Sequence, residues 1–163
     1  MDKQQILVVD DEEINRIILM QMFEDSLDEY ELLEAGNGLE AVEQIDKNQN
    51  IVLILLDVVM PIMDGFKVLE HMQEKKLLEA IPVILITGES IEDSEGRAYD
   101  FGVADVIHKP FLTHIVRRRS KNIIELYQNK RNMERRLKEQ EIAIRAQEQE
   151  IREPNEFMIA ALS

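Results

Sequence analysis

The sequence predicts an α/β fold, a doubly wound five-stranded parallel sheet covered by helices on both faces, followed by a long helical extension of coiled-coil type. Three observations support this prediction. Short β-type runs alternate with amphipathic helical patterns over residues 1–110. Several of these runs are almost continuously apolar, which is typical of strands buried on both faces of a parallel sheet. After Phe111 an apolar repeat of seven residues continues to Glu153 without Gly or Pro.

The strands are predicted from five runs of β-branched and other apolar residues, of which the first, third and fourth are nearly all apolar. They are QILVVD (5–10), YELLEA (30–35), IVLILLD (51–57), PVILIT (82–87) and VADVIH (103–108). The segments between strands place apolar residues three or four apart, the spacing of one helix face. These sets are Ile14, Ile17, Ile18 and Met22, then Leu39, Val42 and Ile45, then Phe66, Leu69 and Met72.

The region after Phe111 is predicted to form one helix of about 40 residues, or about 60 Å. Its heptad a positions are Val116, Ile123, Lys130, Leu137, Ile144 and Ile151, and its d positions are Arg119, Leu126, Met133, Gln140 and Gln147. An apolar seam of this kind needs a partner, and a second copy is the simplest one. We therefore expect a parallel homodimer through residues 112–153, in which Arg136 faces Glu141 of the other copy. A monomeric, solvated helix is the alternative, and the polar residues in the seam suit a junction that shifts between states.

Composition and charge exclude several classes of function. The net charge is −14, and residues 1–112 alone carry 8 Lys/Arg and 25 Asp/Glu. Such an acidic domain repels nucleic acid phosphates, so no direct nucleic acid binding is expected. The absence of cysteine excludes disulfides and thiolate metal sites. There is no apolar run of transmembrane length and no signal peptide at the N-terminus, so a cytoplasmic protein without membrane contact is predicted.

Acidic residues stand where the first and third predicted strands end. Asp10 and Asp11 follow the first strand, and Asp57 ends the third. Adjacent parallel strands would bring the three carboxylates into one hollow. At about 5 Å and an effective dielectric near 20, each like-charged pair would cost about 3 kcal/mol. Either protonation or a bound cation must relieve this repulsion; a divalent cation is the physical solution we expect, and hard carboxylate oxygens favour Mg²⁺.

Two further residues are predicted at the same edge of the sheet. Thr87 ends the fourth strand, and Lys109 follows the fifth, before a proline whose peptide bond could be cis. A lysine, a hydroxyl group and a divalent cation beside a nucleophilic carboxylate are typical of phosphoryl transfer.

The motifs LVVDDE, LLDVVMPIMDG, VILITGE and HKPF, in this order and spacing, resemble bacterial response-regulator receiver domains over about residues 4–127. The resemblance implies a flavodoxin-like sheet of order 2-1-3-4-5. It also implies that Asp57 accepts a phosphoryl group from a sensor histidine kinase or phosphotransfer protein. Asp10, Asp11, Asp57 and the Val59 backbone carbonyl would bind Mg²⁺, while Thr87 and Lys109 would contact the phosphoryl oxygens. Such a domain is no enzyme beyond promoting its own phosphorylation and dephosphorylation.

The sequence departs from the family pattern at one position of the switch. Receiver domains usually have Tyr or Phe three residues before the lysine, and here that residue is Val106. We therefore expect the signal to leave through the surface formed by the fourth helix, fifth strand and fifth helix. Val59 and Glu89, two residues after Asp57 and Thr87, stand where side chains influence attack of water on the acyl phosphate. Because apolar Val59 cannot orient that water, a long-lived phosphorylated state is predicted.

The predicted organisation is a receiver domain at 1–127, a coiled-coil signalling helix at 128–153, and the start of a truncated output region at 154–163, where Pro154 ends the helix. The junction is similar to that before HD-GYP-type phosphodiesterases, with a diguanylate cyclase or kinase-like output as alternatives. A different interpretation is a constitutive coiled-coil dimerisation scaffold whose acidic pocket binds metal and is not phosphorylated.

Overall fold

The computed structural model describes the backbone of residues 3–88 and 92–162, and the side chains of these residues except 92–93 and 153–162. Contacts divide the chain into two compact units, Met1–Tyr127 and Gln128–Ser163. The first unit contains a five-stranded parallel sheet of order β2-β1-β3-β4-β5. The strands are β1 (Gln4–Val9), β2 (Tyr30–Ala35), β3 (Ile51–Asp57), β4 (Val83–Thr87) and β5 (Asp105–His108). The predicted fold class and strand order are confirmed.

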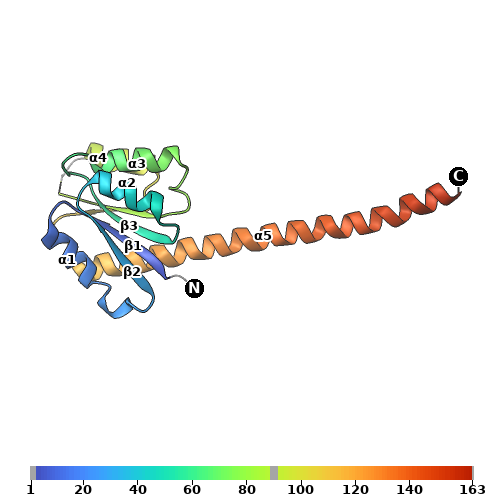
Figure 1. Ribbon diagram of the computed structural model, residues 1–163, viewed down its shortest axis with the longest axis horizontal. Helices are drawn as coiled ribbons and strands as arrows, with labels where there is room; N and C mark the ends of the chain where they lie inside the picture. Colours follow the sequence, from blue (N-terminus) through green and yellow to red (C-terminus); the bar gives the residue numbers. More distant parts are fainter. Residues whose placement is uncertain (1–2, 89–91, 163) are drawn as a thin grey trace. The chain divides into compact units, whose positions relative to one another are not determined.

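Helices cover both faces of the sheet because alternate residues of the central strands point to opposite sides. On one face, Leu7, Ile54 and Leu85 pack in a buried cluster with residues of three helices. These helices are α2 (Gly38–Lys47), α3 (Gly65–Glu74) and α4 (Glu92–Phe101). On the other face, Ile6 and Leu53 pack with residues of α1 (Glu13–Gln21) and of the first part of α5 (Thr113–Leu162) (Figure 1). A short 3₁₀ helix, η1 (Glu24–Ser26), connects α1 to β2.

Two of the helices bury only part of the apolar sets that periodicity indicated, namely Met22 of the first set and Ile45 of the second. Helix α1 forms, but Ile14 and Ile17 are exposed while Leu19 is buried. In α2, Leu39 is exposed, and the buried residues include Ala41 and Ile45. The segment IILM in α1 is apolar all round, so spacing alone does not identify its inward face. The set predicted for α3 is confirmed, since Phe66, Leu69 and Met72 are all buried.

Helix α5 corrects two expectations about the C-terminal region. Val116 is fully buried, and Ile123 packs against the buried core of the first unit. The side chains at these two heptad a positions therefore pack against the core of their own unit. The exposed apolar seam begins at Leu126. The prediction that the helix ends at Pro154 is wrong, because α5 continues to Leu162. A proline removes one backbone hydrogen bond, and a helix can continue past it with a kink. None of the described helices has the combination of length and apolar composition that a membrane crossing requires.

Candidate phosphoacceptor and metal site

The predicted acidic residues meet at the carboxyl ends of two neighbouring strands. Asp57 is the last residue of β3, and Asp10 and Asp11 follow β1, which pairs with β3. Each of the three side chains has a carboxylate oxygen within 4.8 Å of those of the other two. Asp10 is 1% exposed and Asp57 is 6% exposed, whereas Asp11 is open to solvent. The parallel register thus produces the cluster that the sequence predicted.

Lys109 provides the positive charge of the cluster. Its Nζ lies 3.2 Å from Asp10 Oδ2 and 3.5 Å from Asp57 Oδ2. Its backbone N–H donates to the Thr87 carbonyl at 2.8 Å, and its peptide bond to Pro110 is cis. Thr87 itself is buried at the end of β4. The ends of β3, β4 and β5 therefore bring Asp57, Thr87 and Lys109 to one edge of the sheet.

Burial and charge shift the proton affinity of both partners of this ion pair. Burial raises the pKa of Asp57 to about 6, and repulsion by Asp10 adds to this effect, while Lys109 opposes it. For Lys109, burial disfavours the charged form, but attraction by Asp57 and Asp10 outweighs burial, and its pKa is raised. One lysine thus faces three carboxylates, and the site has an excess of negative charge.

Local hydrogen bonds determine where the Asp10 side chain points. Asp10 Oδ1 accepts from the backbone N–H of Glu12 at 2.9 Å, as in an Asx turn. Arg16, in α1, donates from Nη1 to the Asp10 carbonyl at 2.8 Å and from Nε to Glu34 at 3.2 Å. The sequence prediction missed Arg16, because no local pattern indicates a contact between a helix residue and the preceding loop.

Two glycines allow other parts of the backbone to approach the loop after Asp57 closely. Gly65 N–H donates to the Val58 carbonyl at 2.8 Å, and a Cβ at this position would lie 2.4 Å from the Asp57 carbonyl oxygen. Gly38, at the start of α2, approaches the same loop, since a Cβ there would lie 2.3 Å from the Met63 carbonyl oxygen. In the same loop, Ile62 has a φ of 70°, which a β-branched residue rarely adopts. The sequence did not indicate the contact of Gly38 with this loop, because the two segments are distant along the chain.

The remaining predicted positions are placed as follows. Val59 is 57% exposed and lies in the loop after Asp57, and the role of its backbone carbonyl as a metal ligand stays a prediction. Val106 is buried in β5, opposite Leu85 of β4. Glu89 lies outside the described residues.

The donor set fits a hard divalent cation. Carboxylates are the ligands that Mg²⁺ prefers, and the excess negative charge supplies the electrostatic reason for binding it. Asp10, Asp11 and Asp57 would hold the ion, with the Val59 carbonyl as the predicted fourth protein ligand.

Comparisons with known proteins agree with this geometry. The family model described as the response regulator receiver domain matches residues 6–121. The transcriptional regulatory protein SrrA of Staphylococcus aureus is 36% identical over 126 residues, which are 77% of this chain and 49% of SrrA. The chain thus spans about half the length of the curated relatives that it matches.

Two solved structures share the fold. A CheY-like response regulator receiver domain protein from Methanospirillum hungatei has a TM-score of 0.70 at 22% identity, covering 79% of this chain and 99% of that one. A chain of the CheX–CheY–BeF₃–Mg²⁺ complex from Borrelia burgdorferi has a TM-score of 0.65 at 27% identity, covering 74% and 88%. Because the family model matches most of the chain, this protein belongs to the response regulator receiver domain family of two-component signalling.

Proposed function

We propose that residues 1–127 form a phosphoacceptor switch, in which Asp57 takes a phosphoryl group from a histidine kinase or phosphotransfer protein. One observation carries the proposal. The buried Asp57 carboxylate lies within 4.8 Å of the Asp10 and Asp11 carboxylates and 3.5 Å from Lys109 Nζ. A nucleophilic carboxylate, a lysine and an acidic metal site together suit phosphoryl transfer.

In the proposed reaction, a carboxylate oxygen of Asp57 forms a bond to phosphorus while the bond between phosphorus and the donor nitrogen breaks. Lys109, now paired with Asp10 and Asp57, would turn toward a phosphoryl oxygen. The Thr87 side chain, at the end of the adjacent strand, would contact another. When bound by the three aspartates, Mg²⁺ would neutralise negative charge on the phosphoryl group. The Borrelia complex contains both BeF₃ and Mg²⁺, which supports the same assignment here.

The signal would pass from this site to α5. Thr87 pairs with His108 across β4 and β5, and Arg119 of α5 reaches Asp105 of β5 at 3.4 Å. These contacts support a route through the α4–β5–α5 surface that does not depend on an aromatic residue at position 106. We propose that the route ends in a parallel coiled-coil dimer of residues 128–153, which controls an output domain outside this chain, of the HD-GYP phosphodiesterase type or another class.

Acetyl phosphate distinguishes this proposal from a dimerisation scaffold whose pocket only binds metal. With acetyl phosphate and Mg²⁺, the wild-type chain should gain the mass of one phosphoryl group, measured by intact-protein mass spectrometry. Asp57→Asn and chelation by EDTA should each abolish the gain. Asp64→Asn is the matched control, because Asp64 caps α3 in the same loop and asparagine is an equally good cap. An unmodified wild type, or equal modification of Asp57→Asn, would reject the switch in favour of the scaffold.

A further inference from the structure

Arg16 lies beside the metal site, although it forms no ion pair with the three carboxylates of that site. It stands near the start of α1, and its side chain is only 17% exposed. Its Nη1 donates to the carbonyl oxygen of Asp10 at 2.8 Å, and its Nε donates to Glu34 Oε1 of β2 at 3.2 Å. A guanidinium group that is largely withdrawn from water and donates to two separate segments restrains both of them.

The carbonyl group that Arg16 contacts belongs to the peptide group between Asp10 and Asp11. Because this group is planar, its orientation sets the direction in which the Asp11 side chain leaves the backbone. Asp10 has further support, since its N–H donates to the Ala35 carbonyl at 3.2 Å and its Oδ1 accepts from the Glu12 N–H at 2.9 Å. The Asp11 carboxylate is exposed and takes part in no hydrogen bond or ion pair with the described residues. Among the described side chains, Arg16 is thus the one that restrains the peptide group from which Asp11 extends.

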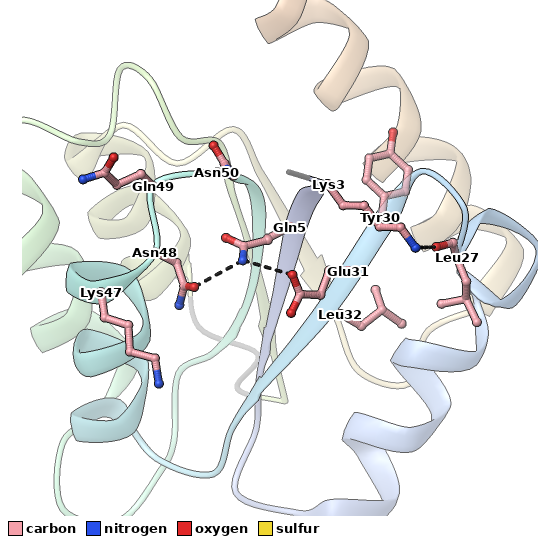
Figure 2. Close-up of a pocket in the computed structure, with 10 residues that line it drawn as sticks. All are labelled: Lys3, Gln5, Leu27, Tyr30, Glu31, Leu32, Lys47, Asn48, Gln49 and Asn50. Atoms are coloured by element: carbon pink, nitrogen blue, oxygen red, sulfur yellow. Dashed lines mark hydrogen bonds between the residues drawn. The ribbon is translucent and has the colours of Figure 1, made fainter. Parts of the chain in front are cut away.

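The other end of β1 is held separately. Gln5 Nε2 donates to Glu31 Oε2 of β2 and to Asn48 Oδ1, just after α2, both at 3.2 Å (Figure 2). Gln5 Oε1 is buried and accepts no hydrogen bond from the described residues, so the two bonds of Nε2 make this connection. Together with the parallel pairing of β1 with β2 and β3, they fix the position of the strand. The adjustable part of the metal site is therefore the peptide group beyond the strand, where Arg16 is bound.

We propose that Arg16 is a positioning residue of the metal site, which holds the peptide group between Asp10 and Asp11 in the orientation that directs both carboxylates to one Mg²⁺. This inference rests on the metal site of the proposed function and adds a residue from outside the carboxylate cluster. Residues that orient metal ligands without touching the metal affect its affinity strongly. An ion pair with Glu34 that served folding alone would leave the affinity for Mg²⁺ unchanged.

The charge of Arg16 makes positioning and electrostatics predict opposite effects. A positive charge beside the site repels Mg²⁺, so its removal would strengthen Mg²⁺ binding if charge alone mattered. Loss of positioning would weaken Mg²⁺ binding. Arg16→Met removes the charge and the donors but keeps an unbranched side chain that favours a helix. Arg16→Lys keeps the charge but replaces the planar fork of donors by a single ammonium group.

Isothermal titration calorimetry of the full chain with magnesium chloride measures the Mg²⁺ dissociation constant without phosphorylation. Arg16→Met should raise this constant about tenfold, the size typical of losing a group that orients metal ligands. Arg16→Lys should raise it about threefold, because one ammonium group cannot hold Asp10 and Glu34 together. Arg118→Met, which removes an exposed arginine of α5, is the matched control and should leave it unchanged. Urea unfolding verifies that each variant is folded.

Phosphorylation by acetyl phosphate provides a second measurement. In Arg16→Met the Mg²⁺ concentration for half-maximal rate should rise about tenfold. The rate at saturating Mg²⁺ should stay within about twofold of the wild-type rate, because the residue acts on metal binding and not on the chemical step.

The inference is overturned if Arg16→Met binds Mg²⁺ as tightly as the wild type or more tightly, or if Arg118→Met weakens binding equally. Should Arg16→Met fail to fold, an unchanged dissociation constant in Arg16→Lys overturns it. A wild type that binds Mg²⁺ but gains no phosphoryl group would reject the proposed switch, while the calorimetric comparison would still decide the role of Arg16.

Discussion

At the residue scale, Asp57 must be buried to be held rigidly and ionised to act as a nucleophile. Burial and the nearby Asp10 carboxylate both disfavour the ionised form, so the pKa is raised to about 6. Lys109 compensates for part of this cost at 3.5 Å. In the metal-free protein at neutral pH, the buried and ionised Asp57 should therefore lower the free energy of unfolding.

We predict that Asp57→Asn stabilises the metal-free protein by about 1–3 kcal/mol at pH 7.5. The folded-state pKa of about 6 exceeds the ordinary value of 3.8, so between these values the folded state binds a proton that the unfolded state releases. Wild-type stability should thus fall as pH rises from about 4 to about 6, and the advantage of asparagine should vanish near pH 4. Urea unfolding in EDTA measures the free energy of unfolding of the wild type and of Asp57→Asn at each pH. Saturating Mg²⁺ should remove the advantage at pH 7.5, and equal stabilities in EDTA at that pH would contradict the prediction.

Val59 should lengthen the life of the phosphorylated state. Its side chain is 57% exposed beside the phosphoacceptor loop and has no group that can orient a water molecule. We predict that Val59→Asn, which adds a hydrogen-bonding side chain, loses the phosphoryl group several-fold faster, by about 1 kcal/mol in barrier height. Decay of phosphorylated protein after removal of acetyl phosphate measures the rate. Val59→Ala serves as the control for size, and equal decay rates for the wild type and Val59→Asn would refute the assignment.

At the scale of elements, the connection from β3 to α3 depends on the close approach of backbone to backbone. A Cβ on Gly65 would lie 2.4 Å from the Asp57 carbonyl oxygen, a distance that forces the strand end or the helix start to move. The same displacement would move the Asp57 side chain away from Asp10 and Lys109. A change in this loop should therefore alter both the free energy of unfolding and the position of the Asp57 side chain.

We predict that Gly65→Ala destabilises the domain by about 2–4 kcal/mol and lowers the rate of phosphorylation by acetyl phosphate. Gly96→Ala in α4 is the matched control. A Cβ there meets no described neighbour outside its own helix within 4 Å, so the change should stabilise by about 0.5–1 kcal/mol. Thermal and chemical unfolding compare the two variants. If Gly65→Ala is as stable as the wild type, the close approach is not a constraint on the fold.

At the scale of the whole molecule, the residues of α5 differ in burial along its length. Val116 and Ile124 are buried in the receiver core, whereas Leu126, Met133, Leu137, Ile144 and Ile151 are exposed at heptad positions. An exposed seam of this composition buries little of its apolar surface in a single chain. Association of two copies would remove it from water.

We predict that the chain forms dimers and that Leu137→Glu raises the dissociation constant at least about a hundredfold, because each dimer loses two buried leucines and gains two buried charges. Ala146→Glu adds the same charge at an exposed c position of the heptad and should have little effect. Sedimentation equilibrium measures the dissociation constants of the wild type and of both variants. Phosphorylation of the receiver should be retained in Leu137→Glu. A wild-type chain that remains monomeric at high concentration would contradict the coiled-coil assignment.

Much of the fold and of the site followed from local patterns. The strand runs were predicted within two residues of their observed bounds, because continuous apolar segments are the strongest sequence signal of a buried parallel sheet. The convergence of Asp10, Asp11 and Asp57 followed from their positions at strand ends. The sequence did not predict which face of α1 is buried. Leu19 and Ile17 are equally apolar, and only the packing of the folded chain buries one and exposes the other.

The sequence by itself determined the alternating elements, the parallel sheet, the identity of the acidic cluster and the heptad repeat, since each depends on residue type and spacing along the chain. Only the tertiary structure decided that Val116 belongs to the core, that Gly38 supports the loop of Asp57, and that Gln5 Oε1 has no donor among the described residues. These are properties of surfaces brought together from distant segments. A hydrogen bond left unmet or a close backbone contact depends on partners that no local pattern specifies.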